Sequence, residues 1–229
     1  MANVNSVPKS LPEILPVFPL TGVLVFPGMI LPLHIFESRY RNLAEDVLSA
    51  EGVFGMIQPF VPREDNRPLP GVEKETPELY GVGCAGYIER WEKLSDGRYV
   101  LELRGMNRFR AEAELPLHRG YRRVKADYSG FADLPVDKDW HCDRAHLMKS
   151  LKEYARGHGL QLRLDQVEQV SDIELVNILG MSLPFHPSER QALLEGSSLR
   201  DRENVLLNLL RLGAGGLDPE QAPPPRTVH

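Results

Sequence analysis

Hydrophobic and polar positions divide the chain into two parts with different periods. From residue 11 to about 128 the apolar stretches are short, and several alternate with polar residues at every second position, a pattern typical of β-strands with one buried face. From about residue 129 to 213 apolar residues recur at helical spacing. Strands followed by helices predict an α+β fold and not a doubly wound sheet.

The β-rich part opens with an apolar, proline-rich segment, residues 11–37. Proline lacks a backbone donor, so strands here must be short, bent or at an edge. Turn signals at Thr21-Gly22 and Pro27-Gly28 divide the segment into three such strands. The pattern predicts a small and strongly curved barrel.

Further along, an apolar stripe from Tyr40 to Leu48 predicts a helix that ends at Gly52. A strand follows at 53–58. Residues 59–79 contain five prolines among many charges, which indicates a long loop of the functional or mobile kind. Asp96-Gly97 predicts a hairpin between two long strands, and residues 121–128 form the last strand.

The helical part carries clear start and stop signals. A helix is expected over 143–156, and the capping-box pattern Ser171 to Glu174 opens a second one. Pro187 begins a third helix that Gly196 ends. Ser198 caps the last helix, which runs to about 213. Residues 1–10 and 214–229 lack periodicity and are expected to be flexible termini.

Several motifs together resemble the Lon N-terminal domain family. The opening signature lies in Pro16–Leu20, Val25–Gly28 and Leu31–Tyr40, and the agreement continues through Phe54–Ile57, Val82–Cys84, Leu103–Phe109 and Leu183–Leu194. The resemblance covers about residues 11–212. It implies a PUA-like β pseudo-barrel, residues 11–128, followed by a C-terminal helical bundle, residues 129–213, within one domain. His186 stands where the family often has serine as a helix cap.

The same resemblance implies a function without chemistry. In Lon proteases this domain is associated with substrate recognition and assembly, and a related domain in cereblon serves as an adaptor. The chain has no G-x-x-x-x-G-K-[ST] phosphate loop, and no counterpart of the Lon peptidase. We therefore expect a stand-alone, non-enzymatic module that binds protein or unfolded polypeptide, with no catalytic residue and no cofactor. A homo-oligomer remains open.

Composition and charge limit the kinds of partner and the cellular compartment that the chain can have. The chain has 229 residues and a net charge of −5, so it offers no general attraction to nucleic acid or anionic lipid. We find no secretory signal and no apolar run long enough to span a membrane. Only two cysteines occur, Cys84 and Cys142. These features predict a cytoplasmic protein.

Four residues are candidates for partner binding. Glu37 and Arg39 lie in the segment most specific to the family, although a charged helix start anchored to the barrel is the more ordinary interpretation. Met29 and Phe60 lie near turns, where exposed apolar side chains can form a contact patch. Phe26 and Pro27 belong to the same stretch, and burial in the barrel is expected for Phe26.

Two alternatives concern nucleic acid and metal. PUA-like folds also occur in RNA-binding proteins, and residues 104–125 contain seven basic residues, so an RNA-binding role is the alternative hypothesis. Interspersed glutamates favour a solvated sheet face instead. Cys142 and His146 could face one way on a helix, but zinc sites need three or four ligands, so no metal is expected.

Overall fold

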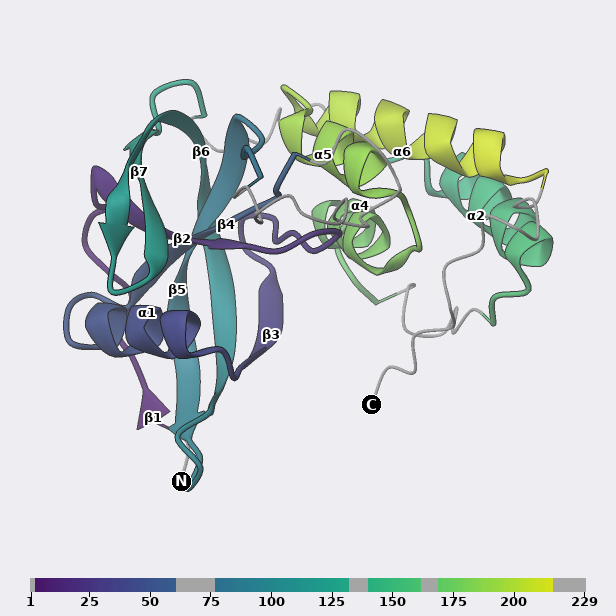
Figure 1. Ribbon diagram of the computed structural model, residues 1–229. Coiled ribbons are helices and arrows are strands. Elements are labelled where there is room, and N and C mark those ends of the chain that lie inside the picture. Colours follow the sequence, from purple (N-terminus) through teal and green to yellow (C-terminus); the bar gives the residue numbers. More distant parts are fainter. Residues whose placement is uncertain (1–2, 61–76, 132–139, 162–168, 216–229) are drawn as a thin grey trace, which may run out of the picture.

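The computed structural model describes residues 3–60, 77–131, 140–161 and 169–215. Its described elements are, in chain order, β1 (Asn3–Val4), β2 (Ile14–Pro19), β3 (Ile30–Ile35), α1 (Ser38–Leu48), β4 (Val53–Ile57), β5 (Val82–Lys93), β6 (Tyr99–His118), β7 (Tyr121–Asp127), α2 (Arg144–His158), α4 (Asp172–Ser182), α5 (Pro187–Glu195) and α6 (Leu199–Gly213). The strands form one half of the molecule and α2 to α6 the other (Figure 1). The predicted α+β class is confirmed.

Five of the strands close into a ring. β5 pairs with β4, β4 with β2, β2 with β7, β7 with β6, and β6 returns to β5. Among the described strand pairs, β2–β4 alone is parallel. β1 and β3 are attached outside the ring, β1 to β5 and β3 to β6. The ring is a small barrel, and β1 and β3 are its two edge strands.

The barrel interior is narrow because a phenylalanine fills it. Phe109 is fully buried, and a Cβ on Gly55 or Gly83 would lie 2.8 or 2.5 Å from its ring. Glycine at both positions therefore lets the ring lie across the barrel axis. The residues packed around it are Leu15, Val17, Val53, Ile57, Ala85, Tyr87, Val124 and Ala126.

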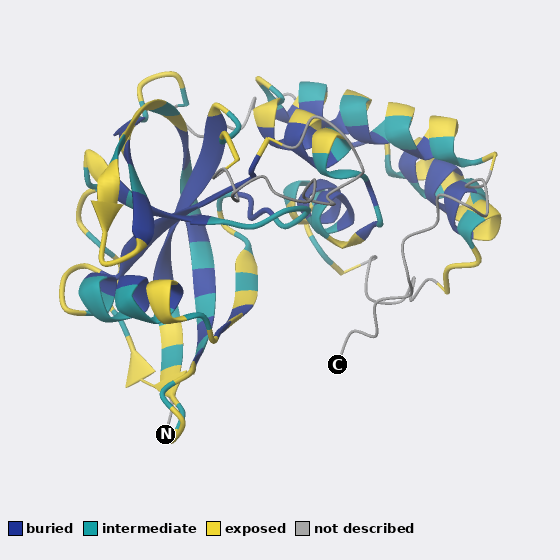
Figure 2. Cartoon of the chain, in the orientation of Figure 1, coloured by how far each residue is buried: buried dark blue, intermediate teal, exposed yellow. Residues whose placement is uncertain are grey.

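The larger hydrophobic cluster lies outside the ring and joins the barrel to α1 and to the helices. Figure 2 shows buried residues along the strands of the barrel and on the helices of the other half. β5 contributes to both clusters, since Cys84 packs outward and Ala85 inward. All residues from Val82 to Ile88 are therefore buried.

Hydrogen bonds and a stacked guanidinium fix the junction between the two halves. Arg108 of β6 donates to the backbone oxygens of Leu194 and Gly196, at 2.8 and 2.6 Å, behind the end of α5. Arg202 of α6 is fully buried, and its guanidinium lies 4.2 Å from the centre of the Phe26 ring. Both arginines satisfy backbone acceptors that burial would otherwise leave unpaired.

The helix boundaries follow the sequence signals closely. The capping box between Ser171 and Glu174 opens α4, and Ser198 accepts from the Asp201 N–H at the start of α6. At α5 the His186 N–H donates to the Glu189 carboxylate at 2.8 Å. The predicted start at Pro187 is confirmed. No helix among the described residues has the length and apolar character needed to cross a membrane.

The structure corrects two expectations and leaves others outside its described residues. The middle one of the three strands predicted in residues 11–37, between Thr21 and Pro27, is absent, because Leu24, Val25 and Phe26 pack as irregular chain into the junction. Residues 3–4, within the terminus expected to be flexible, form β1 instead, since they pair with Trp91 and Arg90. Most of the predicted loop, residues 61–76, and the tail 216–229 lie outside the described residues.

Candidate functional site

An apolar hollow of about 340 Å³ lies between the end of β2, β3 and the start of α1. We call it the seam groove. Its volume is at the lower end of the range of ligand pockets, roughly 300–1,000 Å³. The residues that line it are Phe18, Pro19, Leu20, Val23, Leu31, Pro32, Leu33, His34, Phe36, Glu37, Arg39 and Tyr40.

The strand order explains why the molecule is open here. Arg110 of β6 pairs with Val82 of β5 on one side and with Asp127 of β7 on the other. β3 pairs with the first part of β6, along the edge of β6 that faces away from β5. β7 pairs with the later part of the same edge of β6, so β3 and β7 follow one another along it. Beyond β7 the ring continues with β2. β3 and the end of β2 therefore border a gap that no described strand fills.

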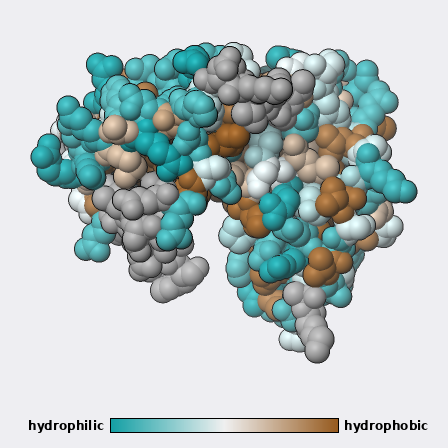
Figure 3. All heavy atoms as spheres, turned by 180° about the vertical axis from the view of Figure 1, so that it is seen from behind, coloured by the Kyte–Doolittle hydropathy of each residue, from teal (hydrophilic) through white to brown (hydrophobic). Residues whose placement is uncertain are grey.

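The groove lies on the side of the barrel that faces the helical half. In Figure 1, β3 stands nearest to that half, and the view from behind in Figure 3 shows an indentation between the two halves with hydrophobic residues at its upper end. Two apolar side chains of this region are exposed: Phe36 at 65% and Ile30 at 40%. Exposed large apolar side chains beside an apolar hollow are typical of contact sites.

The charged residues at the groove neutralise each other. Arg39 and Glu37 form an ion pair at 2.8 Å, and the Arg39 guanidinium lies 4.6 Å from the centre of the Tyr40 ring. Tyr40 in turn packs on Phe18, with ring centres 4.2 Å apart. Burial raises the pKa of the Tyr40 hydroxyl above its ordinary value, and Arg39 opposes part of that increase.

The four predicted contact residues do not form one site. Glu37 and Arg39 line the groove. Met29 lies beyond the start of β3 and is partly buried against the outer hydrophobic cluster. Phe60 is 42% exposed and packs edge-on against Tyr80, with ring centres 5.2 Å apart, beside the start of β5. Whether any of the four contacts a partner remains a prediction.

Sequence reasoning missed the apolar wall of the groove, although one signal for it was present. Along β3, Leu33 and Ile35 are buried while Pro32 and His34 are exposed. Phe36 falls at the next exposed position of this alternation, where a polar residue would be expected, and yet it is aromatic. A large apolar residue in a polar position of the pattern was therefore the available sign of a contact surface.

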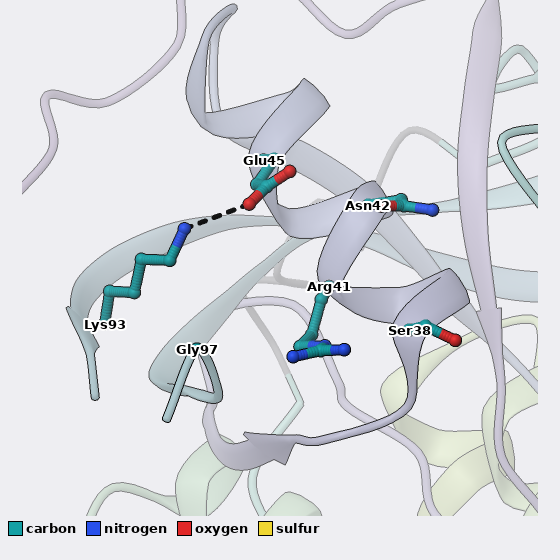
Figure 4. A pocket seen from close by; sticks show the side chains of 6 residues that line it. All are labelled: Ser38, Arg41, Asn42, Glu45, Lys93 and Gly97. Atoms are coloured by element: carbon teal, nitrogen blue, oxygen red, sulfur yellow. Dashed lines mark hydrogen bonds and ion pairs between the residues drawn. The ribbon is translucent and has the colours of Figure 1, made fainter. Parts of the chain in front are cut away.

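A second hollow, of about 270 Å³, lies at α1 and the β5–β6 hairpin and is polar. Figure 4 shows Lys93 pointing at Glu45, with which it forms an ion pair at 3.0 Å. The hydrogen bond from Lys93 lowers the pKa of Glu45. Arg119 also reaches Glu45. These ion pairs of Glu45 connect α1 with the neighbouring strands. Arg41 also lines the hollow, and its buried Nε atom has no hydrogen-bond partner among the described residues.

The basic residues of 104–125 are dispersed and mostly engaged. Arg104 pairs with Glu89 and Lys125 with Glu112, at 2.9 and 3.0 Å. The remaining contacts include Arg119 to Asp46, Arg122 to Glu114, Arg123 to the Pro116 carbonyl, Arg108 to the end of α5 and Arg110 beside Phe131. Phosphates would have to displace carboxylates from several of these residues.

The cysteine and histidine residues near α2 do not converge. Cys142 is buried, and burial raises the pKa of its thiol to about 12, whereas His146 is exposed. Within the described ranges no group of three or more His, Cys, Asp or Glu side chains is placed to hold a metal ion. The thiol instead forms part of the packing between the helices.

Comparisons with known proteins point to one family. Lon protease 2 of Myxococcus xanthus is 25% identical over 206 residues, which is 88% of this chain and 24% of that protein. The Lon protease of Anaeromyxobacter dehalogenans is 27% identical over 210 residues, 88% of this chain and 23% of that protein. The chain thus spans about a quarter of the length of these relatives.

Solved structures and a family-level comparison agree with this. A Lon N-terminal domain protein from Xanthomonas campestris matches with a TM-score of 0.54 and 27% identity, over 84% of this chain and 96% of that one. The N-terminal domain of the Mycobacterium avium complex Lon protease shares the fold, with a TM-score of 0.55 and 19% identity over 86% and 98% of the two chains. Residues 14–211 match the substrate-binding domain of the ATP-dependent protease La (LON), and the chain therefore belongs to that family.

Proposed function

We propose that the chain is a non-catalytic recognition module that binds unfolded polypeptide through the seam groove. The observation that carries the proposal is the combination of an unfilled apolar hollow with an exposed aromatic rim, Phe36, at 65% exposure. Unfolded chains differ from folded ones mainly in presenting apolar side chains to water, and burial of such side chains in a preformed hollow is favourable. Membership of a substrate-binding family supports the same role.

A role in recognition without chemistry also fits the polar groups. The two charged side chains in the groove are paired with each other, and the second hollow contains paired charges as well. In our proposal the chain presents polypeptide to, or recruits it for, a partner connected with proteolysis. We place this activity in the cytoplasm, in keeping with two buried thiols, Cys84 and Cys142, that are not joined in a disulfide.

RNA binding is the weaker candidate. It would require a continuous basic surface that neutralises successive phosphates. Instead, Arg104, Arg119 and Lys125 are each in contact with a carboxylate. A steep loss of RNA affinity with rising salt would favour this alternative over the proposed one.

The test uses a permanently unfolded protein, reduced and carboxymethylated α-lactalbumin, labelled for fluorescence anisotropy, with native α-lactalbumin as the negative control. The full chain should bind the unfolded form and not the native one. Phe36→Ser should weaken binding roughly tenfold or more, because burial of a phenylalanine side chain is worth about 1.5–3 kcal/mol and each 1.4 kcal/mol is a factor of ten.

Leu212→Ser is the matched control. Leu212 lies on α6 and is 83% exposed, so the change removes a still more exposed apolar side chain from an element that does not line the groove. Equal losses for Phe36→Ser and Leu212→Ser would show that binding is unspecific adhesion, and no binding of the unfolded form would refute the proposal.

A further inference from the structure

The outer edge of β3 offers backbone groups that the described part of the fold does not use. β3 pairs with β6 on one side only, and it is the last strand in its sheet. An unpaired strand edge presents a row of N–H and C=O groups that can accept a further strand. Here the edge borders the seam groove, whose lining includes Leu31, Pro32, Leu33 and His34 of β3.

The register shows which residues of β3 point outward. In an antiparallel ladder, residues alternate between those bonded to the partner strand and those whose backbone groups face away. The Gly105 N–H donates to the Met29 oxygen at 2.9 Å, and the aligned pairs continue with Leu31 opposite Leu103 and Leu33 opposite Leu101. These residues bond to β6. The backbone groups of Ile30, Pro32 and His34 therefore face away from β6, and Pro32 and His34 are among the residues that line the groove.

Pro32 provides an independent check on this assignment. Proline has no N–H, so within a sheet it is tolerated where the N–H would face outward. Its position in the middle of β3 agrees with the register. The outer edge thus offers N–H donors at Ile30 and His34, and carbonyl acceptors at these two residues and at Pro32.

The chemistry of the groove selects the kind of strand that fits the edge. Its walls are apolar, and Glu37 and Arg39 neutralise each other at 2.8 Å, so a segment with no net charge meets no unpaired charge. Two β3 edges paired with each other would lack the Pro32 donor on both strands, whereas a segment of another polypeptide would lack it on one strand only. An extended, uncharged segment of another polypeptide is therefore a better occupant than a second copy of this chain.

We propose that the seam groove takes an uncharged, apolar polypeptide segment in extended form, added as a strand to the outer edge of β3. This inference rests on the proposed function and adds how the segment is held: hydrogen bonds to Ile30, Pro32 and His34 hold the backbone, whatever its sequence, and the groove selects its apolar side chains. Recognition by backbone explains how one site accepts many unfolded sequences.

The first experiment changes only the ligand. The probe is a fluorescein-labelled, amidated ten-residue peptide in which valine and threonine alternate, with two further versions methylated on the backbone nitrogens of all valines or of all threonines. In a strand these two sets of N–H groups face opposite edges. One methylated peptide should bind roughly tenfold or more weakly, because it loses several hydrogen bonds to β3, while the other should stay within about threefold of the parent.

The second experiment changes the outward N–H groups of β3. His34→Pro removes one donor and should weaken binding of the parent peptide about three- to tenfold beyond His34→Ala, which removes the same side chain and keeps the N–H. Pro32→Ala restores a donor and should strengthen binding by a similar factor. Circular dichroism and urea unfolding establish that each variant is folded.

The outcomes separate this inference from the function on which it rests. If both methylated peptides and both His34 variants bind equally, while Phe36→Ser still weakens binding, the groove holds side chains only and strand addition is refuted. If neither the peptide nor unfolded α-lactalbumin binds, the proposed function falls as well. A dimer in sedimentation that His34→Pro dissociates would make a second copy the occupant and overturn the inference.

Discussion

The segment between β2 and α1 contributes to two regions that differ in almost every physical respect. Leu24, Val25 and Phe26 are buried in the junction between the two halves, where Arg202 and Arg108 complete the packing. Phe36, at the far end of the same segment, is 65% exposed beside an unfilled hollow. One stretch of chain thus supplies both a filled region and an open one.

The difference lies in what completes each region. At the junction, backbone acceptors left by the ends of α4 and α5 are satisfied from within the chain, by Arg190 and Arg108. At the seam groove the outward backbone groups of β3 have no strand partner among the described residues. Regions whose backbone groups are hydrogen-bonded within the chain contribute to stability, whereas regions with unpaired backbone groups are available for binding. Mutations in the two regions should therefore separate stability from binding.

The largest effect is expected for Arg202→Ala. The change removes hydrogen bonds to the Leu193 oxygen and to Asn177, at 3.1 and 2.7 Å, and the stacking on Phe26. Buried polar partners are left unpaired, so the free energy of unfolding should fall by about 3–5 kcal/mol. Urea unfolding measures it. Arg200→Ala, at an exposed position of the same helix, should change it by less than about 0.5 kcal/mol, and similar losses in both variants would contradict the role of the junction.

Gly105→Ala should have the next largest effect. A Cβ there would lie 2.2 Å from the backbone oxygen of Phe26, so the segment that crosses β6 at this point would have to move. Overpacking of this kind costs about 1–3 kcal/mol. Gly81→Ala provides the matched control, because its Cβ would meet no atom within 4 Å. Equal midpoints of thermal unfolding for the two variants would show that the crossing is not tight.

A smaller effect concerns alkaline pH. Because burial raises the pKa of Tyr40 above 10.0 in the folded chain, the unfolded chain loses this proton first as the pH rises. The stability due to the neutral phenol is thus present below pH 10 and is lost as the pH rises toward the raised pKa. Tyr121, Tyr128 and Tyr154, whose pKa values burial raises to about 12, should act in the same direction.

Tyr40→Phe should make the fall of the unfolding free energy above pH 10 shallower, by at most about 1.4 kcal/mol per pH unit. Urea unfolding between pH 9 and 12 measures the slope. An unchanged slope in this variant would mean that the Tyr40 hydroxyl titrates alike in the folded and unfolded chains.

The smallest effect on stability is expected for Phe36→Ser. Because this side chain is largely exposed, the free energy of unfolding should change by less than about 0.5 kcal/mol, even though binding of unfolded polypeptide should weaken. Urea unfolding and anisotropy on the same preparation test both expectations. A loss above about 1 kcal/mol would place Phe36 among the residues that stabilise the fold, and the contrast between the two regions would disappear.

Local signals account for what the sequence predicted well. The helix starts at Ser171, Pro187 and Ser198 depend on hydrogen bonds within one turn, and the hairpin at Gly97 depends on a positive φ of 82°. Such features need only neighbouring residues and can be recognised in a single sequence. The same holds for the change from strand to helix periodicity that indicated the α+β class.

Long-range contacts account for what the sequence did not show. Leu24, Val25 and Phe26 have the composition of a strand, yet they pack as irregular chain in the junction, where the Arg202 guanidinium of α6 lies over the Phe26 ring. Arg108 and Arg202 look like surface residues until partners 86 and 9 positions away bury them. The seam groove arises because β3 pairs with β6 across a sequence separation of about 70 residues. The sequence pattern alone therefore could not show that the residues lining the groove lie together.

The ladder between β3 and β6 has a mechanical consequence. Its six aligned residue pairs run parallel to the groove, so tension along a segment added to β3 loads all the hydrogen bonds of the ladder in shear. Under shear the hydrogen bonds must all break together, whereas a pull across the strand would open them one by one. Since Arg108 on the same strand is bonded to the end of α5, that tension passes on into the helices. In the proposed arrangement, the module would therefore resist a pull along the bound segment.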